Sequence, residues 1–259
     1  MGRRVYRRGV WISWLVLGCG HRAPDSAALL AAAIARADAA WDERGTTGLD
    51  VAGAALLEAW RLSPDDPEVG WRLVRWRVAE GLATDDPRAA RSAWGQGREQ
   101  GVACLDADPL FRQRREARGW EDALTVLPPE REACAAWLAM AWVRWAAALR
   151  PEASTLDLPT IDAILDATDP DDDVADWASA LLIGVRPTFE GGDPARAAQR
   201  LRAVAQRDPR SVVRWCDLYR WAVLPIGEPE AVGALGQRIR SLRATVPEDA
   251  GARRTALGE

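Results

Sequence analysis

A spacing of small and apolar residues, closed by a proline, recurs along this chain. In the clearest copy Ala197, Leu201 and Val204 stand at i, i+4 and i+7, and Pro209 follows them. These intervals place three side chains on one face of a helix, which the proline ends. A small residue there lets a neighbouring helix come close. The other copies are Ala52, Leu56, Ala59 and Pro64; Gly97, Gly101, Cys104 and Pro109; and Ala139, Val143, Ala146 and Pro151.

A turn and a helix start precede the clearest copy. Gly191 and Gly192 favour a turn, and Asp193 is a residue type that caps helices through its carboxylate. Pro194 fits the first helical position, where a missing N–H is tolerated. The sequence therefore predicts a capped helix from about residue 194 to residue 208.

The whole pattern predicts an all-α fold. Copies of small-large-small spacing followed by proline resemble the second helices of tetratricopeptide repeats, but their prolines are unevenly spaced, whereas regular arrays have a period of 34 residues. We expect a degenerate tetratricopeptide-repeat-like array of about ten to twelve helices over residues 26–246, followed by a C-terminal tail at 247–259. The alternative is an all-α bundle in which the alanine spacing arose by chance.

The strongest predicted helix spans about residues 131–149 and is apolar nearly all round, so we expect it to be central. Other helices are expected at about 26–44, 49–62, 65–82, 111–124, 159–168, 173–184, 211–223 and 229–245, with a further one opening at Asp85.

The first 18 residues have the composition of a signal peptide. Four arginines precede a short apolar run from Val10 to Leu17, which is too short to span a bilayer. The junction Val16-Leu17-Gly18-Cys19 resembles the bacterial lipoprotein box, so we expect lipidation of Cys19 and a tether over residues 19–25. Gly20 follows the cysteine where Asp would favour inner-membrane retention, which favours the outer membrane, facing the periplasm. The alternative is an ordinary secretory signal with an incidental cysteine.

The net charge and the residue types that are present argue against several classes of function. The formal net charge is −4, and removal of residues 1–18, with four arginines and no acidic residue, would make it −8. A chain without a basic excess is a poor candidate for binding nucleic acid. His21 is the one histidine and no lysine is present, so histidine-based catalysis, histidine metal clusters and lysine phosphate loops are unsupported. We expect no enzyme activity, cofactor or metal.

An acidic run at residues 169–173 invites a calcium interpretation. An EF-hand loop needs Gly at position six and Glu at position twelve, where this chain has Val174 and Ala180. A capped helix start explains the run better.

Cysteines and tryptophans leave alternatives open. Cys104 and Cys134 lie in adjacent predicted elements and could form a disulfide in the periplasm, or could be two buried thiols; Cys216 is expected to be buried and inert. Seven of the 14 tryptophans could line a cavity for an apolar ligand, or could fill wide gaps between helices, which we favour. These seven are Trp41, Trp60, Trp71, Trp76, Trp137, Trp142 and Trp145.

Several segments in order resemble one family, the T component associated with tripartite ATP-independent periplasmic (TRAP) transporters, a lipoprotein built from cryptic tetratricopeptide repeats. The matching segments are Ala-Asp-Ala-Ala-Trp-Asp-Glu-Arg at 37–44, Glu-Ala-Trp-Arg-Leu-Ser-Pro at 58–64, Cys-Ala-Ala-Trp-Leu-Ala at 134–139 with Trp145, and Gly-Gly-Asp-Pro at 191–194. Together they cover roughly residues 30–246.

The resemblance implies a membrane-anchored scaffold or ligand relay for solute uptake. It implies a periplasmic solute-binding partner, an apolar ligand, and a trimer with a hydrophobic pore through each subunit, for which Trp137, Trp142, Trp145 and Phe189 are candidate lining residues. The chain departs from the family in the loop before Gly191, which is short at residues 184–190. The alternative is a general interaction scaffold in envelope assembly without a small ligand.

Overall fold

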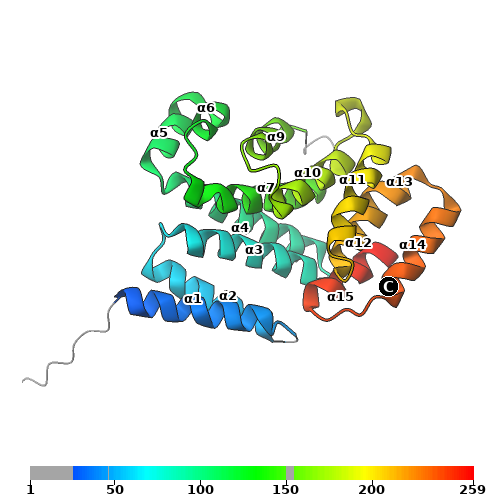
Figure 1. The fold of residues 1–259 in the computed structure, drawn as a ribbon, viewed down its shortest axis with the longest axis horizontal. Helices are drawn as coiled ribbons and strands as arrows, with labels where there is room; N and C mark the ends of the chain where they lie inside the picture. Colours follow the sequence, from blue (N-terminus) through cyan, green and yellow to red (C-terminus); the bar gives the residue numbers. More distant parts are fainter. Residues whose placement is uncertain (1–25, 46, 150–154) are drawn as a thin grey trace, which may run out of the picture.

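A computed structural model describes residues 26–45, 47–149 and 155–259, and it is all-α within these ranges (Figure 1). The signal segment, Cys19 and the tether lie outside the described residues, as does Pro151 of the third copy. Among the helices of the described ranges, none combines the length and the hydropathy that a membrane span requires.

The first helices form antiparallel pairs that stack on one another. Helix α1 (Ser26–Asp42) packs on α2 (Gly48–Leu62), and α3 (Pro67–Ala83) packs on α4 (Pro87–Asp106). The caps explain where α3 and α4 begin: Asp66 and Asp86 each accept a hydrogen bond from a backbone N–H two residues on, and a proline follows each.

Helix α7 (Glu132–Ala147) lies at the centre, as predicted. It contacts α3, α4, α9 (Leu158–Asp166) and α10 (Asp173–Val185). Gly101 explains its close approach to α4, because a Cβ at that position would lie 2.8 Å from the Cβ of Leu138. Gly97, the small residue that opens this copy of the spacing, lies at the same contact, because a Cβ there would lie 3.3 Å from the Cβ of Ala141.

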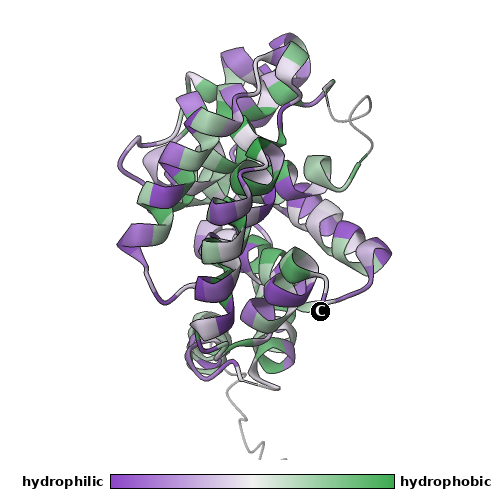
Figure 2. Cartoon of the chain, turned by 90° about the vertical axis from the view of Figure 1, so that its right-hand side faces the viewer, coloured by the Kyte–Doolittle hydropathy of each residue, from purple (hydrophilic) through white to green (hydrophobic). Residues whose placement is uncertain are grey.

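All twelve apolar positions of the four copies are buried, on α2, α4, α7 and α11 (Pro194–Arg207). Helix α11 begins as predicted: Gly191 has φ 90° in the left-handed region, and Asp193 accepts hydrogen bonds from the N–H groups of Ala195 and Arg196. Asp172 likewise caps α10, so the acidic run at 169–173 starts a helix. Figure 2 shows hydrophilic and hydrophobic residues alternating along the helices, as expected when each buries one face.

Two predicted helices are divided. Gly119, with φ 90°, separates α5 (Pro109–Arg118) from α6 (Trp120–Leu124), and a 3-10 turn, η1 (Pro129–Arg131), precedes α7. The helix expected at 211–223 is α12 (Val212–Leu218), which continues into a π-helical turn, η3 (Tyr219–Val223), and then α13 (Leu224–Ile226). Helix α14 (Pro229–Ser241) follows.

The C-terminal residues belong to the helical domain, which corrects the expected boundary at 246. Helix α15 (Pro247–Leu257) packs on α3 and α12, and Gly251 and Ala252 are buried. A Cβ at residue 251 would lie 2.1 Å from the carbonyl oxygen of Leu82, so only glycine fits this crossing. The chain thus returns to its N-terminal half, where Glu248 pairs with Arg44 at 2.7 Å.

Candidate functional site

A cavity of about 510 Å³ lies where α15 meets the N-terminal half of the chain. Residues of α3, α4, α7, α10, α12, η3 and α15 line it. Its apolar wall includes Leu82, Trp94, Leu181 and Trp221. The volume lies in the range of small-molecule sites, which are mostly apolar with few polar groups.

A buried ion pair forms one side of this first cavity. Nη2 of Arg144 lies 2.7 Å from Oδ2 of Asp217, and both side chains are almost fully buried. A second guanidinium nitrogen donates to Oδ1 at 3.3 Å, and Nε1 of Trp177 donates to Oδ2 at 3.0 Å. Three donors therefore satisfy the Asp217 carboxylate, as a buried charge requires.

A third charged residue, Arg220, lines the same cavity from the π-helical turn. Within the described ranges no hydrogen bond or ion pair joins it to another residue; its guanidinium lies 4.9 Å from the ring centre of Trp221. Burial lowers the pKa of Arg220. The negative charge of Asp217 opposes this lowering, and the positive charge of Arg144 adds to it. Arg220 is an exposed residue, so solvent hydrates its guanidinium, and the Asp217 carboxylate acts on it as a counter-charge.

A second ion pair, between Arg254 and Asp85, joins two segments of the first cavity's lining that are far apart in the sequence. Nε of Arg254 on α15 donates to Oδ1 of Asp85 at 2.7 Å, and both side chains are substantially exposed. Both residues line the first cavity. This pair joins the wall formed by α15 to the wall formed by the α3–α4 connection.

A second cavity, of about 310 Å³, adjoins the first. Leu82 lines both, and Trp177, which donates to Asp217 of the first cavity, lines the second. Trp41, Arg75 and Trp137 also face it.

Cation–π stacking accounts for part of the second cavity's wall. The guanidinium of Arg75 lies 4.0 Å from the ring centre of Trp41 and 4.9 Å from that of Trp71. Burial lowers the pKa of Arg75 to about 10, although Asp38 opposes this. Arginine and tryptophan here form packed layers between helices.

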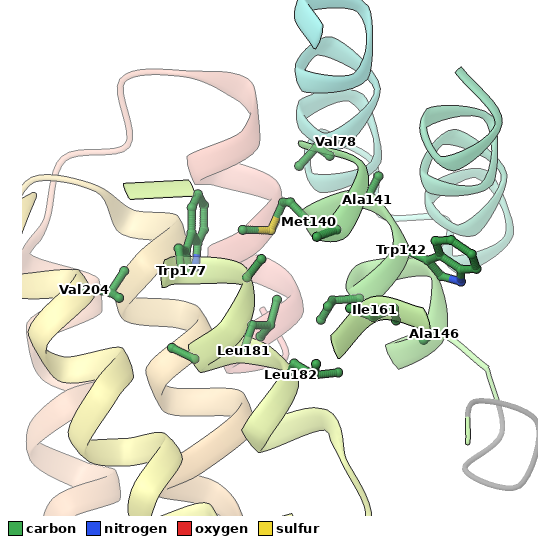
Figure 3. Close-up of a cluster of buried hydrophobic side chains, with 14 of the residues drawn as sticks. Val78, Met140, Ala141, Trp142, Ala146, Ile161, Trp177, Leu181, Leu182 and Val204 are labelled. Carbon is green, nitrogen blue, oxygen red and sulfur yellow. The ribbon is translucent and has the colours of Figure 1, made fainter. Parts of the chain in front are cut away.

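The four candidate lining residues from the sequence do not converge on one cavity. Trp137 lines the second cavity, whereas Trp142 is buried against Trp120 at a ring-centre distance of 5.7 Å. Figure 3 shows Trp142 and Trp177 on opposite sides of the buried cluster that contains Met140.

Trp145 and Phe189 also lie apart from the two cavities. The guanidinium of Arg98 stacks over Trp145 at 4.1 Å. Phe189 is 75% exposed on a 3-10 turn, η2 (Thr188–Glu190), and the loop before Gly191 is shorter than expected because α10 runs to Val185. Neither residue lines the first or the second cavity.

Of the seven tryptophans considered, Trp41 and Trp137 line a cavity and Trp76 fills a gap between helices. Nε1 of Trp76 on α3 donates to the carbonyl of Leu49 on α2 at 3.0 Å. Trp142 is likewise a packing residue. Among these seven, Trp76 and Trp142 thus pack between helices, whereas Trp41 and Trp137 line the second cavity.

The cysteines behave as a disulfide and one isolated thiol. Cys104 and Cys134 are bonded across α4 and α7, and Cys216 is a buried free thiol. Burial raises the pKa of Cys216 to about 12. In the described part of the chain no group of His, Cys, Asp and Glu side chains could hold a metal ion.

Sequence reasoning missed the residues that line the first cavity. Asp217 and Arg220 stand three residues apart, but Arg144 is 73 residues from Asp217 and no local spacing connects it to them. An arginine inside the apolar helix 131–149 was the signal that could have indicated a buried partner, since buried charges are paired. No model of a known protein family matches the chain, and no curated protein matches it.

Proposed function

We propose that this protein is a membrane-anchored periplasmic lipoprotein that assists solute uptake of the TRAP type, as a scaffold and ligand relay without catalytic activity. In this proposal lipid on Cys19 holds the helical domain at the membrane, facing the periplasm and attached to the outer membrane. A periplasmic solute-binding protein is its partner, and a mainly apolar small molecule is its ligand. The chain acts alone or as a trimer.

The first cavity is the observation that carries this proposal. A general interaction scaffold needs no internal space, whereas a relay needs a site large enough for a small molecule. The cavity of about 510 Å³ between α7, η3 and α15 meets that need. The alternative function, a scaffold in envelope assembly, is favoured by the helical array alone.

The experiment separates ligand binding from partner binding. Ala148 lines the cavity and is exposed, so Ala148→Trp should fill space there without disturbing the core. In cells, the full-length chain should cross-link to a periplasmic solute-binding protein. The variant should keep that cross-link and lose ligand binding, measured by calorimetry on protein in lipid nanodiscs.

Three results would count against the proposal. Absence of lipid on Cys19 by mass spectrometry would remove the anchor. Absence of any cross-link to a solute-binding protein would remove the transport role. Ligand binding unchanged by Ala148→Trp would place the ligand elsewhere and favour the scaffold function.

A further inference from the structure

Helix α15 lines both cavities, and it crosses the rest of the domain between them. Glu248 and Asp249, in its first turn, line the second cavity, whereas residues between 252 and 258 line the first. Gly251 stands between these two sets and crosses α3 at Leu82, a residue that lines both cavities. The crossing of Gly251 over Leu82 therefore lies at the boundary between the two cavities.

Few apolar contacts hold α15 in place. Helices α3, α7, α10 and α12 also line both cavities, and each contributes large buried side chains to the main hydrophobic cluster. From α15, all of which the structure describes, this cluster takes Ala252 alone as a buried member, with Ala256 and Leu257 partly buried against it. Elements with little buried apolar surface open locally at a low cost in free energy.

Docking of α15 also buries two neighbouring carboxylates. Glu248 and Asp249 are each 6% exposed. Nε of Arg44 donates to Oε1 of Glu248 at 2.7 Å, but in the described part of the chain no group donates to Oε2. Asp249 accepts hydrogen bonds from backbone N–H groups, among them that of Thr245. Because a buried charge needs full compensation, release of α15 would regain hydration that offsets part of the lost contacts.

The connections of α15 allow it to leave as a unit. Residues 242–246 join it to α14 without helical structure. The ion pair of Arg254 with Asp85, which joins α15 to the α3–α4 connection, is substantially exposed, and such pairs contribute little to stability. Helix α14 lines neither cavity, so rotation about residues 242–246 would leave the other walls of both cavities in place.

We propose that α15 is a movable partition between the two cavities. In its docked position the crossing at Gly251 keeps them apart, and its release at residues 242–246 joins them into one passage for a small molecule. This inference rests on the proposed function for the molecule that passes. The movement itself belongs to α15 and can be measured without a ligand.

Two thiols report the movement, one in each cavity. Cys216 is a buried free thiol that lines the first cavity. Burial raises the pKa of this thiol to about 12, and the charges of Asp217, and of Arg253 and Asp249 on α15, also act on it. Such a thiol reacts slowly with iodoacetamide until α15 leaves it. Ala79→Cys places a second thiol in the second cavity, at a buried position of α3.

The alkylation rates of both thiols are measured in the full-length chain by peptide mass mapping. Gly251→Ala should speed both reactions about tenfold or more, because the added methyl group would lie 2.1 Å from the carbonyl oxygen of Leu82 and push α15 away. Gly233→Ala on α14 is the matched control: its methyl group would meet no atom within 4 Å, and both rates should stay unchanged. Thermal unfolding of each variant checks that it folds.

A covalent link provides the opposite test, which does not depend on the folding of Gly251→Ala. Asp85→Cys with Arg254→Cys, joined by a short bismaleimide, replaces the exposed ion pair with a bond that holds α15 down. Both alkylation reactions should slow about tenfold or more relative to the same variant with these two thiols blocked separately.

Parallel changes in the two rates would support the partition. Equal rates with and without the bismaleimide link would overturn it, as would alkylation with the urea dependence of global unfolding. A faster reaction at Cys216 alone in Gly251→Ala would restrict the movement to the end of α15 and overturn the joined passage. Absence of lipid on Cys19 or of a solute-binding partner would count against the proposed function and leave these rates unchanged.

Discussion

Arg144 and Asp217 form a buried ion pair that joins α7 to α12 across 73 residues of sequence. Asp217→Ala should lower the free energy of unfolding by about 3–5 kcal/mol, because it leaves Arg144 buried without a counter-charge. Chemical denaturation measures this loss.

The same pair offers its own control. Arg144→Met with Asp217→Leu removes both charges and should recover most of the loss, since apolar residues replace buried pairs well. Asp85→Ala breaks only the exposed pair with Arg254 and should cost less than about 1 kcal/mol. Equal losses for Asp217→Ala and Asp85→Ala would contradict the role assigned to burial.

Two glycines should respond to alanine with opposite signs. Gly251→Ala should destabilise the protein by about 1–3 kcal/mol, because the new methyl group would collide with the backbone of Leu82. Gly233→Ala on α14 meets no atom within 4 Å and should stabilise the protein by about 0.5–1 kcal/mol. Thermal unfolding of both variants checks the contrast, and stabilisation by Gly251→Ala would contradict the packing of α15.

The disulfide should stabilise the fold because the loop that it closes restricts the unfolded chain. Cys104 and Cys134 are 30 residues apart, so replacing both with alanine should lower the free energy of unfolding by about 2–4 kcal/mol. Non-reducing peptide mapping should recover the linked peptides. Cys216→Ala is the control, and recovery of Cys104 and Cys134 as free thiols would refute the linkage.

An acidic pair on α10 should make stability depend on pH. Burial alone would raise the pKa of Asp173, but hydrogen bonds and charges of Arg214 and Arg207 outweigh it and hold the pKa below its ordinary 3.8. Asp176 shows the same balance with Arg207 and Arg200. The stabilisation is therefore present above about pH 4 and is lost as pH falls through the lowered pKa values.

Asp173→Asn tests this dependence. Because the pair is partly exposed, the variant should be less stable at neutral pH by only about 1 kcal/mol, and the difference should shrink below pH 3.8. Asp171→Asn, at an exposed position without an ion pair in the described residues, should show no such dependence. A difference that is constant from pH 3 to pH 7 would contradict the linkage.

Local signals in the sequence predicted the helices whose ends carry caps and whose faces carry apolar residues. Asp193 and Pro194 defined α11, and the alanines of α7 indicated a central helix. Helix α15 was missed as part of the domain because it packs through Gly251 and Ala252, which give a weak hydrophobic pattern. The divisions at Gly119 and at η3 depend on tertiary packing that overrides local propensity.

The candidate site was less predictable than the fold. Trp137, Trp142 and Trp145 share one helix but face different neighbours, and the sequence does not tell which face meets space and which meets protein. Arg144 and Asp217 are recognised as a pair only once α7 and α12 are placed together, because 73 residues separate them in the sequence.

The return of α15 to α3 gives the first cavity a thermodynamic property. A molecule held there touches walls whose residues are separated by more than half of the chain, such as Trp94 and Thr255. Occupancy and docking of α15 are therefore linked equilibria: a bound ligand opposes the local opening of this helix, and any opening releases the ligand. Amide hydrogen exchange along α15 would then report how full the cavity is, without a label on the ligand.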